Sequence, residues 1–324
     1  MAQLCPFCLG ESGFELQKKS DSRTQGYICR NETRCEVPRS YVEQYREYPP
    51  VVVNAVGFRA HGKSVFFATL IHALRSTPRH WKRFYTSAVE ERDLDVVNAN
   101  IDMLDRGELP DATPKNFPRP TMVRISKVPV LRPNATLLFF DTGGECFEKA
   151  SQLVQHAHFV KRARTVMLLI SVPNLKDPAG EMHNLLNTYT IGMDELQGQT
   201  AAQNLVVVYT KADEMADRLS RWDGLEPYLR DGHLGSLTDA RGYMKGMRDI
   251  SARLEAFTRQ DLEADNFVNM ARARFSDVQF CIVSALGQSA KDKRFDFKIV
   301  SKRILDPLLW HLYWSLSSWG RLWA

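Results

Sequence analysis

The chain has 324 residues, of which 44 % are hydrophobic and 25 % charged, and its formal net charge is +5. This composition is typical of a globular protein with one large domain and an appendage, or with two domains. It excludes disordered, collagen-like and disulfide-scaffold proteins. The sequence shows neither a signal-peptide pattern nor an apolar run of roughly 20 residues, so we expect a cytoplasmic protein. The basic excess lies in residues 48–89, which hold six Lys and Arg and no carboxylate; an anion is expected near that stretch.

Four of the six cysteines fall within the first 35 residues, as Cys5, Cys8, Cys29 and Cys35. Two such pairs, about twenty residues apart, can complete a tetrahedral zinc site, although the second pair is spaced more loosely than usual. We therefore predict a small zinc ribbon in residues 1–48 whose folding energy comes from structural Zn²⁺. The alternative is a redox dithiol or a disulfide pair, which a reducing compartment disfavours. The module has no net charge, so we do not expect it to bind nucleic acid. Residues 39–50 are interpreted as a linker.

A phosphate-binding pattern follows the apolar run at 51–56, which predicts a buried parallel strand. The next eight residues form a complete G-x4-G-K-S, and an unbroken apolar helix is expected after them. Glycines allow the backbone N–H groups to turn toward phosphate oxygens, Lys63 bridges the β- and γ-phosphates, and Ser64 ligates Mg²⁺. The residues expected to bind the phosphates are Gly57, Ala60, His61, Gly62, Lys63, Ser64 and Val65.

Two further predicted strands end in residues suited to a guanine base. The run 205–209 leads to Thr210, Lys211 and Asp213, and the run 278–283 leads to Ser284, Ala285 and Leu286. A carboxylate at Asp213 accepts from the N1–H and the 2-amino group of guanine, whereas adenine offers neither donor. The stem of Lys211 can cover the purine face, and a backbone N–H of residues 284–286 can donate to guanine O6.

A fourth predicted strand, at 136–140, leads into Asp-Thr-Gly-Gly-Glu. Asp141 is placed where a carboxylate supports magnesium from its second coordination sphere, and Gly144 is placed to offer its N–H to a γ-phosphate. Each piece taken alone is also compatible with an ordinary surface turn. The order of the four strand ends favours one nucleotide site.

Over residues 50–320 the sequence resembles the Ras-like, translation-factor-related class of P-loop GTPases, through its GFRAHGKS, DTGGE, TKAD and SAL motifs. The zinc ribbon, the DTGGE motif and the length resemble the bacterial double-GTPase group linked to conflict systems. The resemblance implies a doubly wound α/β domain that binds GTP or GDP with Mg²⁺ and hydrolyses GTP. It places Lys63, Gly144 and a switch threonine beside the reacting phosphate.

Several positions depart from that family's pattern. Glu145 replaces the water-orienting Gln, and because it cannot donate to the γ-phosphate we expect slow hydrolysis without a partner. Arg59 either acts as an arginine finger in cis or points to solvent. His61 is expected to pack outward. Thr210 replaces Asn, and its hydroxyl can still tie two loops together. The switch threonine, which reaches magnesium, is assigned to Thr113, with Thr121 as the alternative.

The remaining segments are interpreted as scaffold around an insertion at about 76–120. Helices are expected over 87–106, 181–198 and 242–262, with strands at 122–125 and at 164–173, the latter as the central strand. The last eighteen residues hold four of the six tryptophans. They suit a final core helix, with partner docking and weak membrane-interface contact as alternatives.

The sequence thus predicts a zinc module and linker at 1–48 and a GTPase domain at 49–324. The expected function is Mg²⁺-dependent GTP binding with slow hydrolysis, acting as a conformational switch toward a protein partner, an effector or a second GTPase. Two alternatives stay open. One is a non-hydrolysing nucleotide-binding adaptor, and the other is a zinc-containing ATPase that acts on nucleic acid.

Overall fold

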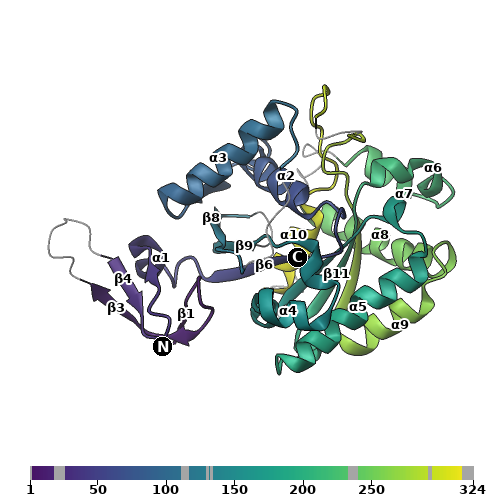
Figure 1. Ribbon diagram of the computed structural model, residues 1–324. Helices are drawn as coiled ribbons and strands as arrows, with labels where there is room; N and C mark the ends of the chain where they lie inside the picture. Colours follow the sequence, from purple (N-terminus) through teal and green to yellow (C-terminus); the bar gives the residue numbers. More distant parts are fainter. Residues whose placement is uncertain are drawn as a thin grey trace.

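The computed structural model describes residues 2–17, 26–110, 117–128, 131, 134–232, 240–290 and 294–315 (Figure 1). Its body is a mixed α/β fold built on a seven-stranded, mostly parallel sheet with the order β12-β11-β10-β6-β9-β8-β7. Only the β7–β8 and β8–β9 pairs of this sheet are antiparallel in the described part of the chain. The strands are β6 (Pro50–Val56), β7 (Tyr85–Ala88), β8 (Thr121–Ser126), β9 (Ala135–Phe140), β10 (Thr165–Ile170), β11 (Asn204–Tyr209) and β12 (Asp277–Ile282).

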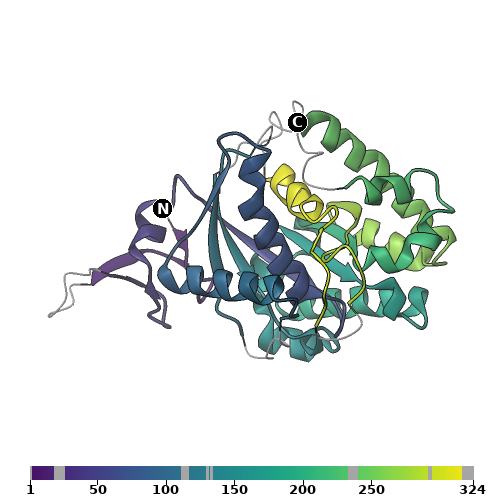
Figure 2. The same cartoon turned by 90° about the horizontal axis from the view of Figure 1, so that it is seen from above.

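Helices cover both faces of this sheet. They are α2 (Lys63–Ser76), α3 (Glu91–Asp105), α4 (Ala150–His156), α5 (Pro178–Glu195), α6 (Ala216–Leu219), α7 (Leu225–Arg230), α8 (Ala240–Gln260), α9 (Asp265–Arg274) and α10 (Asp306–Trp314). Figure 2 shows α10 on the same side of the molecule as α2. Alternate residues of each inner strand enter different cores, one beneath α2 and α10 and the other beneath α4, α5 and α9.

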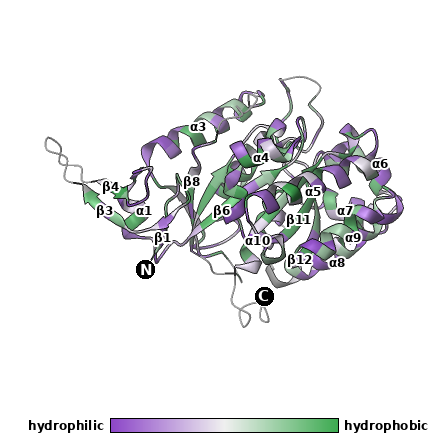
Figure 3. Ribbon diagram, turned by 60° about the horizontal axis from the view of Figure 1, so that its bottom comes forward, coloured by the Kyte–Doolittle hydropathy of each residue, from purple (hydrophilic) through white to green (hydrophobic). Residues whose placement is uncertain are grey.

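The inner strands form because they are continuous apolar runs, the pattern of a parallel sheet buried on both faces. All six residues of β9 and all six of β10 are buried. Figure 3 shows the inner strands β6 and β11 largely in hydrophobic colours, whereas the surrounding helices carry many hydrophilic residues. The strand at 164–173 was expected to be central, and this is wrong: β6, with three neighbours on each side, holds the middle.

The helix expected over 87–106 is shorter than predicted, and a strand precedes it. Helix α3 starts only at Glu91, because residues 85–88 form the edge strand β7, paired with β8. The exposure of β7 alternates along its length, which is the period of a strand and not of a helix. The sheet therefore gains an antiparallel edge strand from the insertion.

The N-terminal module contains a β1–β2 hairpin, a three-stranded β3-β4-β5 sheet and one short helix. Its elements are β1 (Gln3–Leu4), β2 (Glu11–Ser12), β3 (Phe14–Gln17), β4 (Gly26–Cys29), β5 (Glu36–Val37) and α1 (Arg39–Glu43). In Figure 1 the module projects from the end of the sheet that carries β8.

The segment interpreted as a linker is instead α1, and it attaches the module to the body. Tyr41 is 2 % exposed and its hydroxyl donates to the Leu4 carbonyl at 2.8 Å. The Ser40 hydroxyl donates to the Val89 carbonyl at 3.0 Å, and Arg124 donates to the Ser40 carbonyl at 2.8 Å. The apolar residues of the module share one continuous core with the sheet. The module is therefore packed on the body through buried and hydrogen-bonded contacts.

The C-terminal helix α10 belongs to the core. Trp310 is 1 % exposed and stacks on Trp314 with ring centroids 5.6 Å apart. The indole N–H of Trp314 donates to Asp277 at 3.1 Å. The other two tryptophans, Trp319 and Trp323, lie outside the described residues. Within the described part of the chain, no helix has both the length and the apolarity needed to cross a membrane.

Asp93, in the first turn of α3, is a buried carboxylate that gives the fold a testable pH dependence. It is 3 % exposed, and burial raises its pKa to about 6, although the Met122 N–H donates to it at 3.0 Å. A carboxyl whose pKa is raised on folding binds more protons when folded, so its ionisation destabilises the fold as pH rises through about 6.

We expect Asp93→Asn, which keeps the acceptor for Met122, to raise the free energy of unfolding at pH 8 by about 2 kcal/mol. The gain should shrink toward zero near pH 4, where Asp93 is protonated in the folded protein. Denaturant titrations at the two pH values measure this. The exposed Asp95 of the same helix supplies the control Asp95→Asn, for which no such gain is expected. An equal change in stability at both pH values would contradict the expectation.

Candidate nucleotide-binding site

The carboxyl ends of β6, β9, β11 and β12 meet at one edge of the sheet, because these strands run parallel. The four motifs found in the sequence directly follow these strands. In an open α/β sheet this edge is where ligands bind. The fold thus gathers all four motifs in one region.

The loop between β6 and α2 turns through two left-handed residues, Ala60 at φ 65° and Gly62 at φ 78°. Gly57 lies so close to β10 that a Cβ there would be 2.6 Å from the Leu169 carbonyl oxygen. Ser64 and Val65 lie in the first turn of α2. The loop therefore leads straight into a helix N-terminus, where free N–H groups and the helix dipole favour an anion.

Lys63 begins α2 and bends back over this loop. Its ammonium donates to the carbonyls of Gly57 at 2.9 Å and Phe58 at 3.1 Å, and the residue is only 6 % exposed. Burial lowers the pKa of Lys63 to about 8, an effect that the nearby Asp141 and Glu145 carboxylates oppose. A buried cation held by carbonyl oxygens is the electrostatic complement of a phosphate.

His61 does not pack outward as expected. It is 3 % exposed, its Nδ1 lies 3.1 Å from the Leu169 carbonyl oxygen, and its ring meets Phe58 edge-on at 5.6 Å. Burial lowers the pKa of His61, so the neutral ring braces the loop against β10. The carbonyl of His61 accepts from the Thr210 hydroxyl at 3.0 Å, which is the link between two loops that the hydroxyl was expected to make.

The loops after β11 and β12 meet through Asp213 and Ser284. The Ser284 hydroxyl donates to the Asp213 carboxylate and accepts from the Gly287 N–H at 2.9 Å. Ser284's own N–H donates to the Lys302 carbonyl at 3.1 Å. Ser284 therefore orients the carboxylate, while Ala285 and Leu286 are left to face a ligand.

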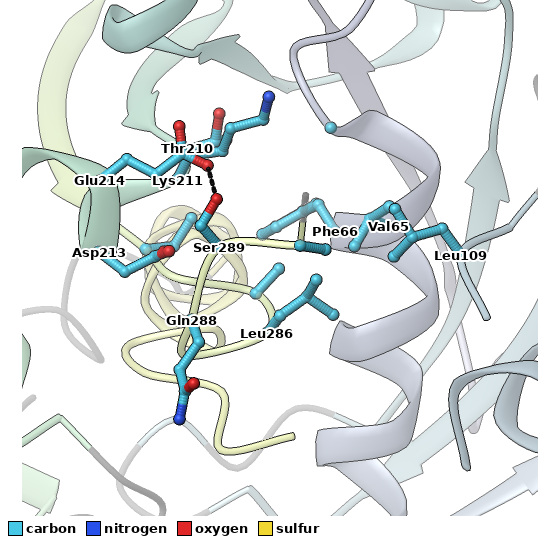
Figure 4. A pocket seen from close by; sticks show the side chains of 14 residues that line it. Val65, Phe66, Leu109, Thr210, Lys211, Asp213, Glu214, Leu286, Gln288 and Ser289 are labelled. Carbon is cyan, nitrogen blue, oxygen red and sulfur yellow. Dashed lines mark hydrogen bonds between the residues drawn. The ribbon is translucent and has the colours of Figure 1, made fainter. Parts of the chain in front are cut away.

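A pocket of about 610 Å³, open solvent included, lies between these loops and α2. Figure 4 shows Val65, Phe66 and Leu109 on one side and the segment from Thr210 to Glu214 on the other. The pocket is lined by Gly62, Val65, Phe66, Leu109, Thr210, Lys211, Asp213, Glu214, Val283, Ala285, Leu286, Gln288, Ser289 and Ala290.

Half of this lining was absent from the sequence prediction. Leu109 comes from the insertion, and Gln288, Ser289 and Ala290 come from the chain beyond the SAL motif. The Ser289 hydroxyl donates to Glu214 at 2.8 Å (Figure 4). The Lys211 ammonium donates to the Asn174 side-chain oxygen at 2.8 Å. This hydrogen bond holds the aliphatic stem of Lys211 along the pocket. These contacts join distant parts of the chain, and no local motif signals them.

The loop after β9 closes the phosphate side of the site. A Cβ on Gly144 would lie 2.4 Å from the Arg59 backbone nitrogen, so glycine is required for the DTGGE and GFRAHGKS loops to touch. Glu145 follows in the 3-10 helix η2 (Gly144–Phe147). Its carboxylate is 3.8 Å from the Arg59 guanidinium, whose side chain is 77 % exposed. The expected catalytic residues Lys63, Arg59, Gly144 and Glu145 therefore lie together.

Of the two candidates for the switch threonine, only Thr121 lies within the described residues. Thr113 lies outside the described residues. Thr121 is the half-buried first residue of β8 and pairs with Phe139, two residues before Asp141. The assignment to Thr113 stays a prediction.

The four N-terminal cysteines form one cluster, as the sequence predicted. The sulfurs of Cys5, Cys8, Cys29 and Cys35 all lie within 4.8 Å of one another. The N–H of Cys35 donates to the Cys29 sulfur at 3.1 Å, and the Asn31 amide donates to the Cys8 sulfur at 3.1 Å. Four sulfurs with N–H donors around them fit a structural Zn²⁺ site.

Hydrogen bonds favour a thiolate at Cys8, whereas burial raises the pKa of Cys5 and of Cys35. Burial alone disfavours ionisation of Cys8, but donors from Thr33, Gly10 and Asn31 outweigh it and lower the pKa of Cys8 to about 7. All four cysteines are free of disulfides. The cluster therefore has the chemistry of a metal ligand set, and a disulfide pair is not formed.

Comparison with known proteins gives only distant likenesses. No family model matches the chain, and no curated protein does. A crystallised variant of SsGBP has 12 % identity and a TM-score of 0.34, with 87 % of this chain and 60 % of that one covered. The GTP-bound GTPase-like domain of S. cerevisiae Ski7 has 14 % identity and a TM-score of 0.34, covering 85 % and 53 %. Sup35 with GDP has 14 % identity and a TM-score of 0.31, covering 79 % and 43 %. The chain spans about 60 % or less of the length of these structures.

We expect the purified chain to carry about one equivalent of zinc, and Cys8→Ser to lose it with a lower melting temperature. A structural site with three of its four ligands binds zinc more weakly, and the module has little core to compensate. Metal analysis by mass spectrometry and a thermal melt measure both effects. Cys281→Ser changes a buried cysteine outside the cluster and should keep the zinc. Full zinc content in Cys8→Ser would contradict a four-cysteine site.

Proposed function

We propose that this chain is a Mg²⁺-dependent GTP-binding protein that hydrolyses GTP slowly and acts as a conformational switch toward a protein partner. One observation carries the proposal. The buried Lys63 ammonium and the oriented Asp213 carboxylate lie at the same sheet edge, and the pocket between the loops that carry them is open. This arrangement suits a nucleotide with its phosphates on the loop before α2 and its base between Lys211 and Leu286.

The carboxylate supports guanine over adenine. Asp213 is anchored by Ser284 through one oxygen, which leaves acceptor capacity for a base with two adjacent donors. Guanine supplies N1–H and the 2-amino group, whereas adenine presents a lone pair at N1 and would be repelled. In this reading Ala285 or Leu286 donates a backbone N–H to guanine O6.

Magnesium would be held by the Ser64 hydroxyl and supported by Asp141, whose charge is near enough to raise the pKa of Lys63. An ion bound there neutralises charge that develops on the β- and γ-phosphates. Thr113 would complete the set when GTP is bound. Release of that residue after hydrolysis is the switching event that a protein partner would sense.

Slow hydrolysis follows from Glu145. An ionised carboxylate beside a γ-phosphate repels it and cannot donate to it, so the water is poorly positioned. The Arg59 guanidinium 3.8 Å away offsets part of that charge, and its high exposure leaves it able to reach the phosphates. This pairing also favours the second candidate function, a non-hydrolysing GTP-binding adaptor. The third candidate, an ATPase acting on nucleic acid, gains nothing from the neutral zinc module.

The base assignment is tested with Asp213→Asn. We expect the affinity for GTP to fall about 100-fold, because two charge-assisted hydrogen bonds are lost, and the affinity for XTP to rise. Titration with fluorescent GTP, XTP and ATP analogues measures this. Glu214→Gln removes the neighbouring carboxylate of the same pocket and should leave the preference for GTP unchanged. Unaltered GTP binding by Asp213→Asn would exclude guanine recognition through this residue.

The hydrolysis assignment is tested with Glu145→Gln. We expect single-turnover phosphate release to become about tenfold faster and GTP to bind at least as tightly, since the amide no longer repels the γ-phosphate and donates to it. Glu148→Gln, an exposed change three residues on, is the control and should leave the rate unaltered. Tight GTP binding with no phosphate release, both from the unmodified chain and from the Glu145→Gln variant, would favour the adaptor over the GTPase. A slower rate in Glu145→Gln would make Glu145 itself the useful base.

A further inference from the structure

The wall of the pocket opposite Asp213 includes Leu109, the last residue of a short segment, Gly107 to Leu109, that no motif predicted. It follows α3 and precedes the part of the insertion that contains Thr113. Leu109 lines the pocket and packs in a small apolar cluster with Val65, Leu104 and Leu286. The insertion therefore reaches into the base pocket.

A second segment, residues 294–302, holds Gly107 to Leu109 in place. The Phe295 N–H donates to the Gly107 carbonyl at 2.7 Å, Glu108 forms a β-bridge with Arg294, and their side chains pair at 3.1 Å. Gly107 has φ 72°, and a Cβ there would lie 2.0 Å from the Phe295 carbonyl oxygen. Only glycine fits this contact without displacing a backbone.

The same segment 294–302 also supports the loop expected to read guanine. The Lys302 N–H donates to the Ser284 carbonyl at 2.8 Å, and the Val300 N–H donates to the Leu286 carbonyl at 3.1 Å. The Ser301 hydroxyl donates to the Ala285 carbonyl at 2.6 Å. One stretch of chain thus joins the loop at 284–286 to the segment at 107–109, and we name this arrangement the clasp.

We propose that Leu109 is a base-contacting residue and that Gly107, through the clasp, is the positioning residue that sets it against the nucleobase. The inference rests on the proposed nucleotide site and adds a fifth segment to it. A base held between Lys211 and Leu286 also contacts Leu109 at its side, so its binding restrains the backbone of residues 107–109. A ligand that consists of phosphates alone does not contact Leu109, so its affinity does not depend on this residue.

The experiment compares two ligands on the full-length protein, a fluorescent GDP analogue and inorganic tripolyphosphate, each with Mg²⁺. Gly107→Ala displaces the clasp, and Leu109→Ala removes the apolar contact while leaving the clasp backbone intact. We expect each change to weaken GDP about tenfold, mainly through faster dissociation, with tripolyphosphate affinity within about twofold of the unmodified chain. Gly246→Ala is the matched control, because a Cβ at Gly246 meets no atom within 4 Å, and GDP affinity should be unchanged.

The outcomes separate the inference from the function on which it rests. If the unmodified chain binds neither GDP nor tripolyphosphate, the proposed function fails and the inference with it. If the unmodified chain binds both and Leu109→Ala binds GDP equally well, the inference alone is wrong. Equal weakening of GDP and tripolyphosphate in both variants would show a general structural role and would also overturn it. Should Gly107→Ala not fold, Leu109→Ala decides.

Discussion

The buried ammonium of Lys63 is the constraint around which the sheet edge is organised. It is nearly excluded from water and is held by two carbonyl oxygens, and burial lowers its pKa to about 8. A cation in such a place is stabilised by an anion that brings its own charge into the loop. Neighbouring residues hold the loop around Lys63 in this conformation. Gly57 lets the loop lie on β10, the neutral His61 ring braces it, and Gly144 allows the next loop to approach within contact distance.

The N-terminal module is stabilised differently from the body of the fold. Its described strands are short, so a metal ion held by the four sulfurs, which lie within 4.8 Å of one another, would add the stability that a small core lacks. The module is nevertheless continuous with the body. Tyr41 is buried where the two meet, and Ser40 hydrogen-bonds to both Val89 and Arg124. These contacts fix the module to the edge of the sheet that carries β7 and β8.

Much of this could be predicted locally. The strands at 51–56, 136–140, 205–209 and 278–283 were confirmed within one residue at each end, because each is a short, predominantly apolar run rich in β-branched or aromatic residues. The zinc-ribbon spacing of four cysteines predicted their cluster. The inward position of His61 could not be predicted, because it depends on the Leu169 carbonyl, more than a hundred residues away. The edge strand β7 and the pocket wall at Leu109 likewise depend on partners supplied by the folded chain.

The described segments before and after Thr113 contact different parts of the molecule. Before it, Gly107 to Leu109 are joined to the base loop by residues 294–302. After it, Phe117 stacks on His158 with ring centroids 4.2 Å apart, and the Arg119 guanidinium lies 4.1 Å above the ring of Phe7 and pairs with Glu90. Phe7 stands between Cys5 and Cys8, inside the first cysteine turn. The described residues before Thr113 thus contact the pocket through Leu109, and those after it contact the first cysteine turn through the side chains of Arg119 and Phe7.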